Sequence, residues 1–214
     1  MDRSDIPTYV NDEPDIRRPP SVRPLALAAI AGTGVFASAA LGAVTNAING
    51  WVSPLYFVTI MRWQGVENVW LASIAQGVFE GLCFGVFFSL VFTAGVAILT
   101  RASCSYAFAA LHLLGILAGA LVCWCIGGAA AMGLATVSPE FYRRTFIGVP
   151  EAFGEMLAYA WVGGSIWGVQ LGGLVSVILG LIILAANWRR RLSARREGGR
   201  DEGASHLPRE SQDG

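Results

Sequence analysis

Charged side chains are scarce in this sequence, and lysine is absent. Only 14% of the 214 residues are charged, and all 15 basic residues are arginine. Most of the arginines lie near the two ends of the chain, and the sequence shows no basic surface interleaved with aromatic residues. We therefore expect no nucleic-acid partner. So little charge also excludes an ordinary soluble domain, in which about a quarter of the residues are charged.

Cysteine is also scarce, and its spacing excludes the common redox and zinc motifs. The four cysteines include no Cys-x-x-Cys pair. Cys83, Cys123 and Cys125 occur at similar depths in apolar runs, and thiolates gathered there would suit a thiophilic ion such as Cu(I). Cys123 and Cys125, however, are two positions apart on one expected helix and point to nearly opposite faces. We therefore expect no metal site.

Signatures of catalysis are absent as well. His112 is the one histidine in an apolar run, and a single histidine cannot bind haem from both sides. The sequence has no hydrolase triad, phosphate-binding glycine loop or zinc signature. We expect no cofactor and no catalytic residue, and we do not expect an enzyme.

Long apolar runs are what the sequence does contain, and 54% of its residues are hydrophobic. The runs cover approximately residues 25–50, 70–99, 106–135 and 156–186. Each is long enough to cross a bilayer, since about 20 apolar residues suffice. The sequence predicts an all-α membrane protein with one four-helix transmembrane domain over residues 25–188. We expect residues 1–24 to be a disordered polar tail, and residues 189–214 to be a tail that is basic at first and disordered from Leu192 onward, with His206 in it.

The first apolar run resembles a cleaved signal peptide in one respect. Arginines precede it, and it contains the cleavage-like triplet Ala37-Ser38-Ala39. The run continues past this triplet to a length that spans a membrane. It also has a counterpart in the third run, described below. We therefore expect it to be retained as a helix.

A Ser-Pro-aromatic turn follows the first run and another follows the third. Ser53-Pro54 and Ser138-Pro139 are typical helix starts, in which the serine hydroxyl caps free N–H groups and proline fits the first helical position. Aromatic residues follow each pair. The turns are interpreted either as short helices at the membrane surface or as ordinary loops with anchoring aromatics.

The two turns belong to a wider pattern of internal repetition. They are 85 positions apart, and the same offset relates Gly34 to Gly119 and Gly42 to Gly127. Two further residues in the loop bring a glycine series of the second run onto one of the fourth. Four-residue glycine spacing lets helices pack closely, and the two series are Gly77, Gly81 and Gly85, and Gly164, Gly168 and Gly172. The sequence predicts two tandem parallel-repeat hairpins related by an axis along the membrane normal.

Arginines at both ends predict the orientation of the helices. Arg17, Arg18 and Arg23 precede the first run, and residues 189–191, all arginine, follow the last one. Because arginines next to a spanning helix are retained in the cytoplasm, we expect both termini to be cytoplasmic and the Ser-Pro turns extracytoplasmic. The expected location is the cell membrane.

Polar residues within the runs are the candidate site. Glu80 is a carboxylate in an apolar helix, and Gln76 precedes it by one turn, while Asn46 and Asn49 occur at a similar depth of the first run. Such a group could be a proton or cation site or the floor of an extracytoplasmic cavity. The alternative, which polar side chains in membrane helices favour, is interhelical hydrogen bonding by a neutral Glu80. Glu80 aligns with Trp167, so the site would belong to one repeat only.

The function expected from these features is non-catalytic. Glycine faces on the second and fourth helices predict a packing or assembly partner in a membrane complex, bound to itself or to another membrane protein within the lipid bilayer. The alternative is a small-solute or proton-coupled transporter or channel with its polar site around Glu80. The two differ in whether that site is hydrated and continuous with the outside.

Overall fold

The four apolar runs all form long helices. The structure is a computed structural model that describes residues 23–205, with side chains described up to residue 194. In chain order its helices are α1 (Pro24–Val52), α2 (Pro54–Ile60), α3 (Val69–Thr100), α4 (Tyr106–Val137), α5 (Pro139–Thr145) and α6 (Phe153–Ser205). Helices α1, α3, α4 and the Phe153–Ala194 part of α6 are long and apolar enough to cross a membrane, which confirms the predicted all-helical multi-pass membrane protein.

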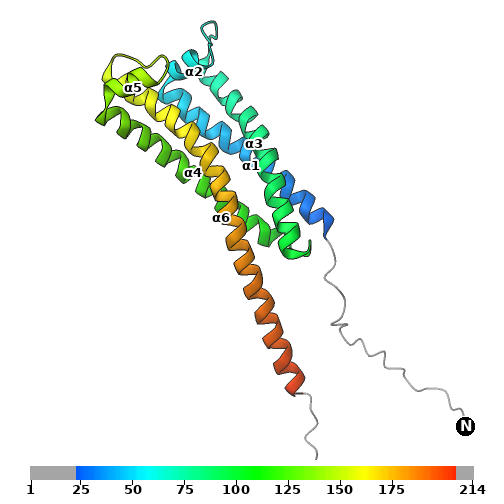
Figure 1. Cartoon of the computed structure of the whole chain (residues 1–214). Helices are drawn as coiled ribbons and strands as arrows, with labels where there is room; N and C mark the ends of the chain where they lie inside the picture. Colours follow the sequence, from blue (N-terminus) through cyan, green and yellow to red (C-terminus); the bar gives the residue numbers. More distant parts are fainter. Residues whose placement is uncertain (1–22, 206–214) are drawn as a thin grey trace, which may run out of the picture.

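The short helices mark one end of the bundle. α2 and α5 lie together at that end, whereas the described chain begins and ends at the other (Figure 1). Residues 1–22 and 206–214 are outside the described part of the structure, and with them the predictions of a disordered N-terminal tail and of His206 in a C-terminal one.

The last helix is longer than the sequence analysis predicts. We expected residues from Leu192 onward to be without regular structure, but α6 continues to Ser205, well past the other helices (Figure 1). The segment is polar, yet alanine, arginine and glutamate are good helix formers. Adding residues to a helix that already exists avoids the unfavourable nucleation step. Polarity alone was therefore a poor guide to where the helix ends.

Both Ser-Pro pairs begin short helices. Pro54 and Pro139 are the first residues of α2 and α5, and Ser53 and Ser138 occupy the capping positions. Neither hydroxyl makes the capping hydrogen bond that we expected. With ψ near 86° and 70° instead of an extended value, both serines use their backbone carbonyls, which accept from Tyr56 N at 3.2 Å and Tyr142 N at 3.0 Å.

The glycines of α3 pack against α1. A methyl group added at Gly77 would overlap the backbone carbonyl of Gly42, and one added at Gly81 would meet the backbone of Ser38 and Ala39. Such close backbone approach strengthens dispersion contacts, which matter in lipid because the hydrophobic effect scarcely favours helix association there. α1 and α3 therefore form one tight pair.

The glycines of α6 pack against α4 in the same manner. A methyl group at Gly164 would overlap the carbonyl of Gly127, and one at Gly168 would overlap the carbonyl of Cys123. Gly172 lies against the Cys123 side chain. α4 and α6 therefore form a second tight pair, and both glycine series are directed at the chain's own helices.

The two pairs meet along a seam between larger side chains. Phe88 of α3 lies over Gly173 of α6, and Leu113 of α4 approaches Gly34 of α1. Toward the chain ends, the seam is closed by a cluster of buried apolar residues from all four spanning helices, including Ile30, Phe92, Val96, Phe108, Leu113, Ile116, Val177 and Leu184.

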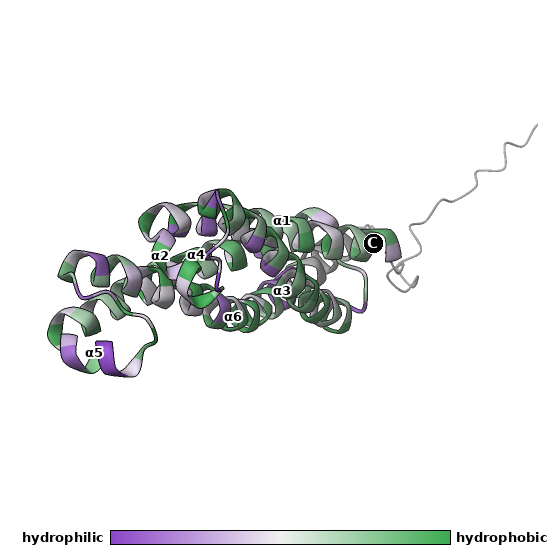
Figure 2. Ribbon diagram, turned by 90° about the horizontal axis from the view of Figure 1, so that it is seen from above, coloured by the Kyte–Doolittle hydropathy of each residue, from purple (hydrophilic) through white to green (hydrophobic). Residues whose placement is uncertain are grey.

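The outward faces of the bundle suit a bilayer. Seen from above, the long helices carry mostly hydrophobic colouring and α5 carries much of the hydrophilic colouring (Figure 2). Phe36, Leu114 and Ile182 are among the large apolar side chains that are more than half exposed. An apolar exterior of this extent is stable in lipid and not in water.

Candidate functional site

The four predicted polar residues belong to two separate sets of hydrogen bonds. Asn46 and Asn49 of α1 are buried, and the Asn49 Nδ2 donates to Asn46 Oδ1 at 3.5 Å. Asn49 Oδ1 accepts from the hydroxyl of Ser165 on α6 at 3.0 Å. This hydrogen bond links the two helix pairs. The sequence analysis missed Ser165. It is a small polar residue next to Gly164 of the glycine series, and serine is too common in membrane helices to indicate a site by itself.

Glu80 and Gln76 form a separate pair on α3. The amide Nε2 of Gln76 donates to Glu80 Oε1 at 2.9 Å, and both side chains are half-buried. In the part of the chain whose side chains are described, Glu80 Oε2 has no hydrogen-bond partner in the protein. The carboxyl group therefore retains an acceptor for a molecule outside the protein.

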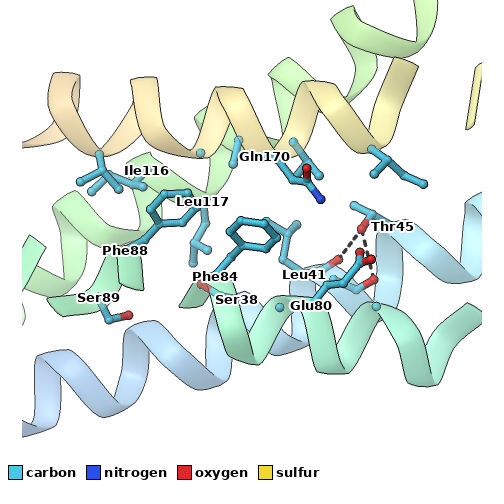
Figure 3. Close-up of a pocket in the computed structure, with 18 of the residues that line it drawn as sticks. Ser38, Leu41, Thr45, Glu80, Phe84, Phe88, Ser89, Ile116, Leu117 and Gln170 are labelled. Atoms are coloured by element: carbon cyan, nitrogen blue, oxygen red, sulfur yellow. Dashed lines mark hydrogen bonds between the residues drawn. The ribbon is translucent and has the colours of Figure 1, made fainter. Parts of the chain in front are cut away.

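A central cavity of about 90 Å³ lies in the seam between the helix pairs. Its polar end is formed by Thr45 and Asn46 of α1, Glu80 of α3 and Gln170 of α6. Glu80 and Gln170 approach one another from opposite sides, and Phe84 and Phe88 lie further along the cavity (Figure 3). The rest of its lining is almost wholly apolar.

A larger outer pocket of about 560 Å³ lies beneath α2 and α5. It shares three lining residues with the central cavity, namely Glu80, Ile166 and Gln170. These three side chains therefore lie at the junction of the two spaces. Gln170 was not among the predicted site residues, because Gln76 was selected for its position one turn before Glu80 and Gln170 has no such acidic neighbour in the sequence.

Aromatic residues surround the outer pocket, namely Tyr56, Tyr142, Phe146, Tyr159 and Trp167. The rings of Tyr56 and Tyr159 are 5.0 Å apart between centroids. The Tyr159 hydroxyl donates to the Ile147 carbonyl at 2.6 Å, which fixes the ring at the outer end of α6.

Burial makes the phenols of α2 and α5 harder to ionise than free tyrosine. Burial raises the pKa of Tyr56 above its usual value of 10.0, and the nearby Glu80 raises it further. Burial, with a smaller contribution from Tyr56, raises the pKa of Tyr142 to about 12. Both therefore remain protonated hydrogen-bond donors at neutral pH.

The cysteines and His112 do not come together. Among the residues that the structure describes, no three histidine, cysteine or acidic side chains are placed to hold a metal ion. Cys83 and Cys125 are exposed on the outer faces of their helices, while Cys123 packs on Gly172.

His112 has a structural environment. Its Nδ1 lies 2.8 Å from the Phe108 carbonyl, to which it must donate, and its Nε2 lies 3.1 Å from the amide Nδ2 of Asn187 on α6. An Nδ1–H tautomer satisfies both partners, since Nε2 then accepts from the amide. The histidine thus joins α4 to α6 and leaves no ring nitrogen free for a ligand.

Comparison with known proteins gives no further guide to the chain: no family model, no curated protein and no solved structure matches it.

Proposed function

We propose that this chain binds and passes a small solute through the membrane, with Glu80 as its intramembrane polar site. The observation that carries the proposal is that Glu80 and Gln170 line both the outer pocket and the central cavity. A transporter or channel needs its polar site to be continuous with the outer end of the bundle, whereas an assembly partner does not. A carboxylate that only bonded helices together would be enclosed by protein, whereas Glu80 faces open space on both sides.

The use of the glycine series within the chain also favours this proposal. The case for an assembly partner depended on glycine faces available for docking. Gly77 and Gly81 are instead covered by α1, and Gly164 and Gly168 by α4. Their packing accounts for the stability of the chain itself and offers no surface to a partner.

Two rigid pairs joined by a looser seam suit a transport cycle. The solute path is open at the α2 and α5 end and closed at the other by buried side chains such as Phe92, Phe108 and Ile116. Rocking one pair against the other would open the seam at one end as it closes at the other, as in transporters built from repeats.

The packing contacts support an internal duplication. Gly34 approaches Ser89 in the first pair, and Gly119 approaches Ser176 in the second. The two glycines are 85 positions apart and the two serines are 87 positions apart. These are the offset of the Ser-Pro turns and that offset with the two further loop residues. We propose that α1 and α3 form one parallel repeat and α4 and α6 the other, each with a Ser-Pro turn.

Access from the outer end can be tested with a cysteine at the junction. In a protein whose four cysteines are replaced by alanine, Gln170→Cys should react with a membrane-impermeant methanethiosulfonate reagent added outside cells. The reason is that the outer pocket reaches this position. Mass spectrometry of the purified protein measures the reaction.

The matched control is Ser176→Cys, on the same helix but against Gly119, away from the outer pocket. It should stay unmodified under the same conditions. If Gln170→Cys is no more reactive than Ser176→Cys, the junction is closed to water and the proposal is wrong.

Orientation follows from the arginines. We propose that the chain lies in the cell membrane with both termini cytoplasmic, since Arg23, Arg101 and Arg191 lie at one end of the bundle: Arg23 N donates to the carbonyl of Ala102, next to Arg101, and Arg191 lies over the ring of Phe108 near the start of α4. A reporter fused to either terminus should read cytoplasmic, and one inserted between Trp63 and Asn68 should read external. An external signal from the C-terminus would reverse the orientation.

Assembly remains the second candidate, supported by one surface. A groove of about 390 Å³ between α4 and α6 is lined by small residues, including Gly115, Gly119 and Gly180. Nothing in the described part of the chain lies over Gly115, so a helix of a second copy or of another membrane protein would fit there. Identification of proteins that co-purify in mild detergent tests this candidate.

A further inference from the structure

The one charged group described beside the central cavity and the outer pocket is negative. Among the residues that the structure describes, Glu80 is the single charged residue lining either the central cavity or the outer pocket. Arg143 of α5 is directed elsewhere, with its guanidinium 3.8 Å from Glu140 and 3.9 Å from Glu151. An anionic solute would therefore meet no counter-charge in this site, and a cation would meet one.

Aromatic rings give the outer pocket a second affinity for cations. Tyr56 and Tyr159 lie against one another, and Trp167 and Tyr142 complete the wall. The faces of aromatic rings attract cations, and tryptophan and tyrosine do so most strongly. A cation moving inward would pass these rings before it reaches the Glu80 carboxyl group.

The central cavity selects against small inorganic cations. Such ions need several oxygen ligands to replace their water. At the polar end of the cavity the Thr45 hydroxyl and the Asn46 amide oxygen are already hydrogen-bonded within α1, which leaves the Glu80 carboxyl group and the Gln170 amide, with Phe84, Phe88 and Phe92 beyond them. From Glu80 to Phe92, α3 extends by roughly 18 Å at 1.5 Å per residue. Over that apolar length, the cavity of about 90 Å³ can take one hydrocarbon or aromatic group attached to a charged centre.

We infer that the solute is a lipophilic organic cation, such as an ammonium or phosphonium ion with aromatic or alkyl groups. Its charge lies beside Glu80, one substituent enters the central cavity on its Phe84 and Phe88 side, and the other substituents remain in the larger outer pocket. The inference rests on the function proposed above, and it adds the chemical class of the solute.

The test compares two ions of nearly the same shape and opposite charge. The full-length protein, held in nanodiscs of phosphatidylcholine, is titrated with tetraphenylphosphonium and separately with tetraphenylborate, and bound ion is measured by equilibrium dialysis. Saturable binding of the cation alone is expected. Equal binding of both ions would mean that hydrophobicity and not charge governs the site, and would overturn the inference.

Variants connect the binding to the site. Glu80→Gln should weaken binding of tetraphenylphosphonium by about tenfold or more, the usual effect of removing one close charge pair, and Glu80→Asp should retain most of it. Glu155→Gln changes an exposed carboxylate that lines neither space and should bind as the unaltered protein does. Unchanged affinity in Glu80→Gln would contradict the inference.

A second variant covers the case in which Glu80→Gln does not fold. Trp167 is 63% exposed and lines the outer pocket, so Trp167→Ala should leave the fold intact. It should weaken cation binding by roughly two- to fivefold. A folded Trp167→Ala protein with full affinity would show that the rings do not contribute.

Failure here can be told apart from failure of the proposed function. If Gln170→Cys reacts with the impermeant reagent but the cation does not bind, the path exists and the solute class is wrong. If the cation binds through Glu80 while Gln170→Cys is unreactive, the solute reaches the site from the lipid, and the outer path is wrong. If both fail, both proposals fall.

Discussion

Replacing Gly81 or Gly168 with leucine should lower the apparent melting temperature of the detergent-solubilised protein by roughly 5 °C or more. Each leucine would insert four carbons where the partner helix brings its backbone, at Ser38 and Ala39 for Gly81, and at Cys123 and Gly127 for Gly168. Overpacking typically costs about 1 to 3 kcal/mol. In a protein of this size each kcal/mol shifts melting by about 2 to 4 °C.

The matched control is Gly133→Leu. Gly133 also lies in a spanning helix, but nothing lies within 4 Å of a methyl group placed there. Its melting temperature should change little. Because the two glycine series are covered within the chain, neither variant should alter the oligomer size measured by light scattering. Loss of an oligomer without a change in melting would mean that the glycines face another molecule.

The glycines illustrate what the sequence could and could not predict. Four-residue spacing indicates that Gly77, Gly81 and Gly85 share one helix face and that this face packs closely. Spacing does not identify the neighbour, which could have been a second copy. Only the structure places α1 against α3 and α4 against α6, and so removes the docking surface on which the first functional interpretation depended.

The polar residues show the same limit. Counting along the helices placed Asn46, Asn49, Gln76 and Glu80 at one depth, and that counting gives height in the membrane but not direction around the helix axis. In the structure, Asn49 is bonded to Ser165 of α6, while Glu80 lines both the central cavity and the outer pocket with Gln170. The sequence identified Glu80, its partner Gln76 and Asn46, which lines the central cavity with Glu80, but it did not identify Gln170.

The second expected result concerns the hydrogen bond that joins the two helix pairs. Asn49 is fully buried, accepts from Ser165 and donates to Asn46. Asn49→Ala removes both bonds and leaves the buried Asn46 without its partner. Leaving a buried polar group unpaired costs about 1 to 3 kcal/mol. The melting temperature should fall by several degrees, by roughly 2 to 4 °C for each kcal/mol.

A double-mutant cycle with Ser165→Ala separates the bond from the loss of side-chain contacts. Ser165→Ala should cost less, because it removes one hydrogen bond to Asn49, whereas Asn49→Ala removes two. Hydrogen bonds measured in this way in membrane proteins are worth about 0.6 kcal/mol on average and up to about 1.7 kcal/mol. The drop in melting temperature of the double variant should therefore be slightly smaller than the sum of the drops of the two single variants. Gln64→Ala, at an exposed amide in the α2–α3 loop, is the control. Strictly additive losses would mean that the bond does not hold the pairs together, and that packing across the seam alone resists their separation.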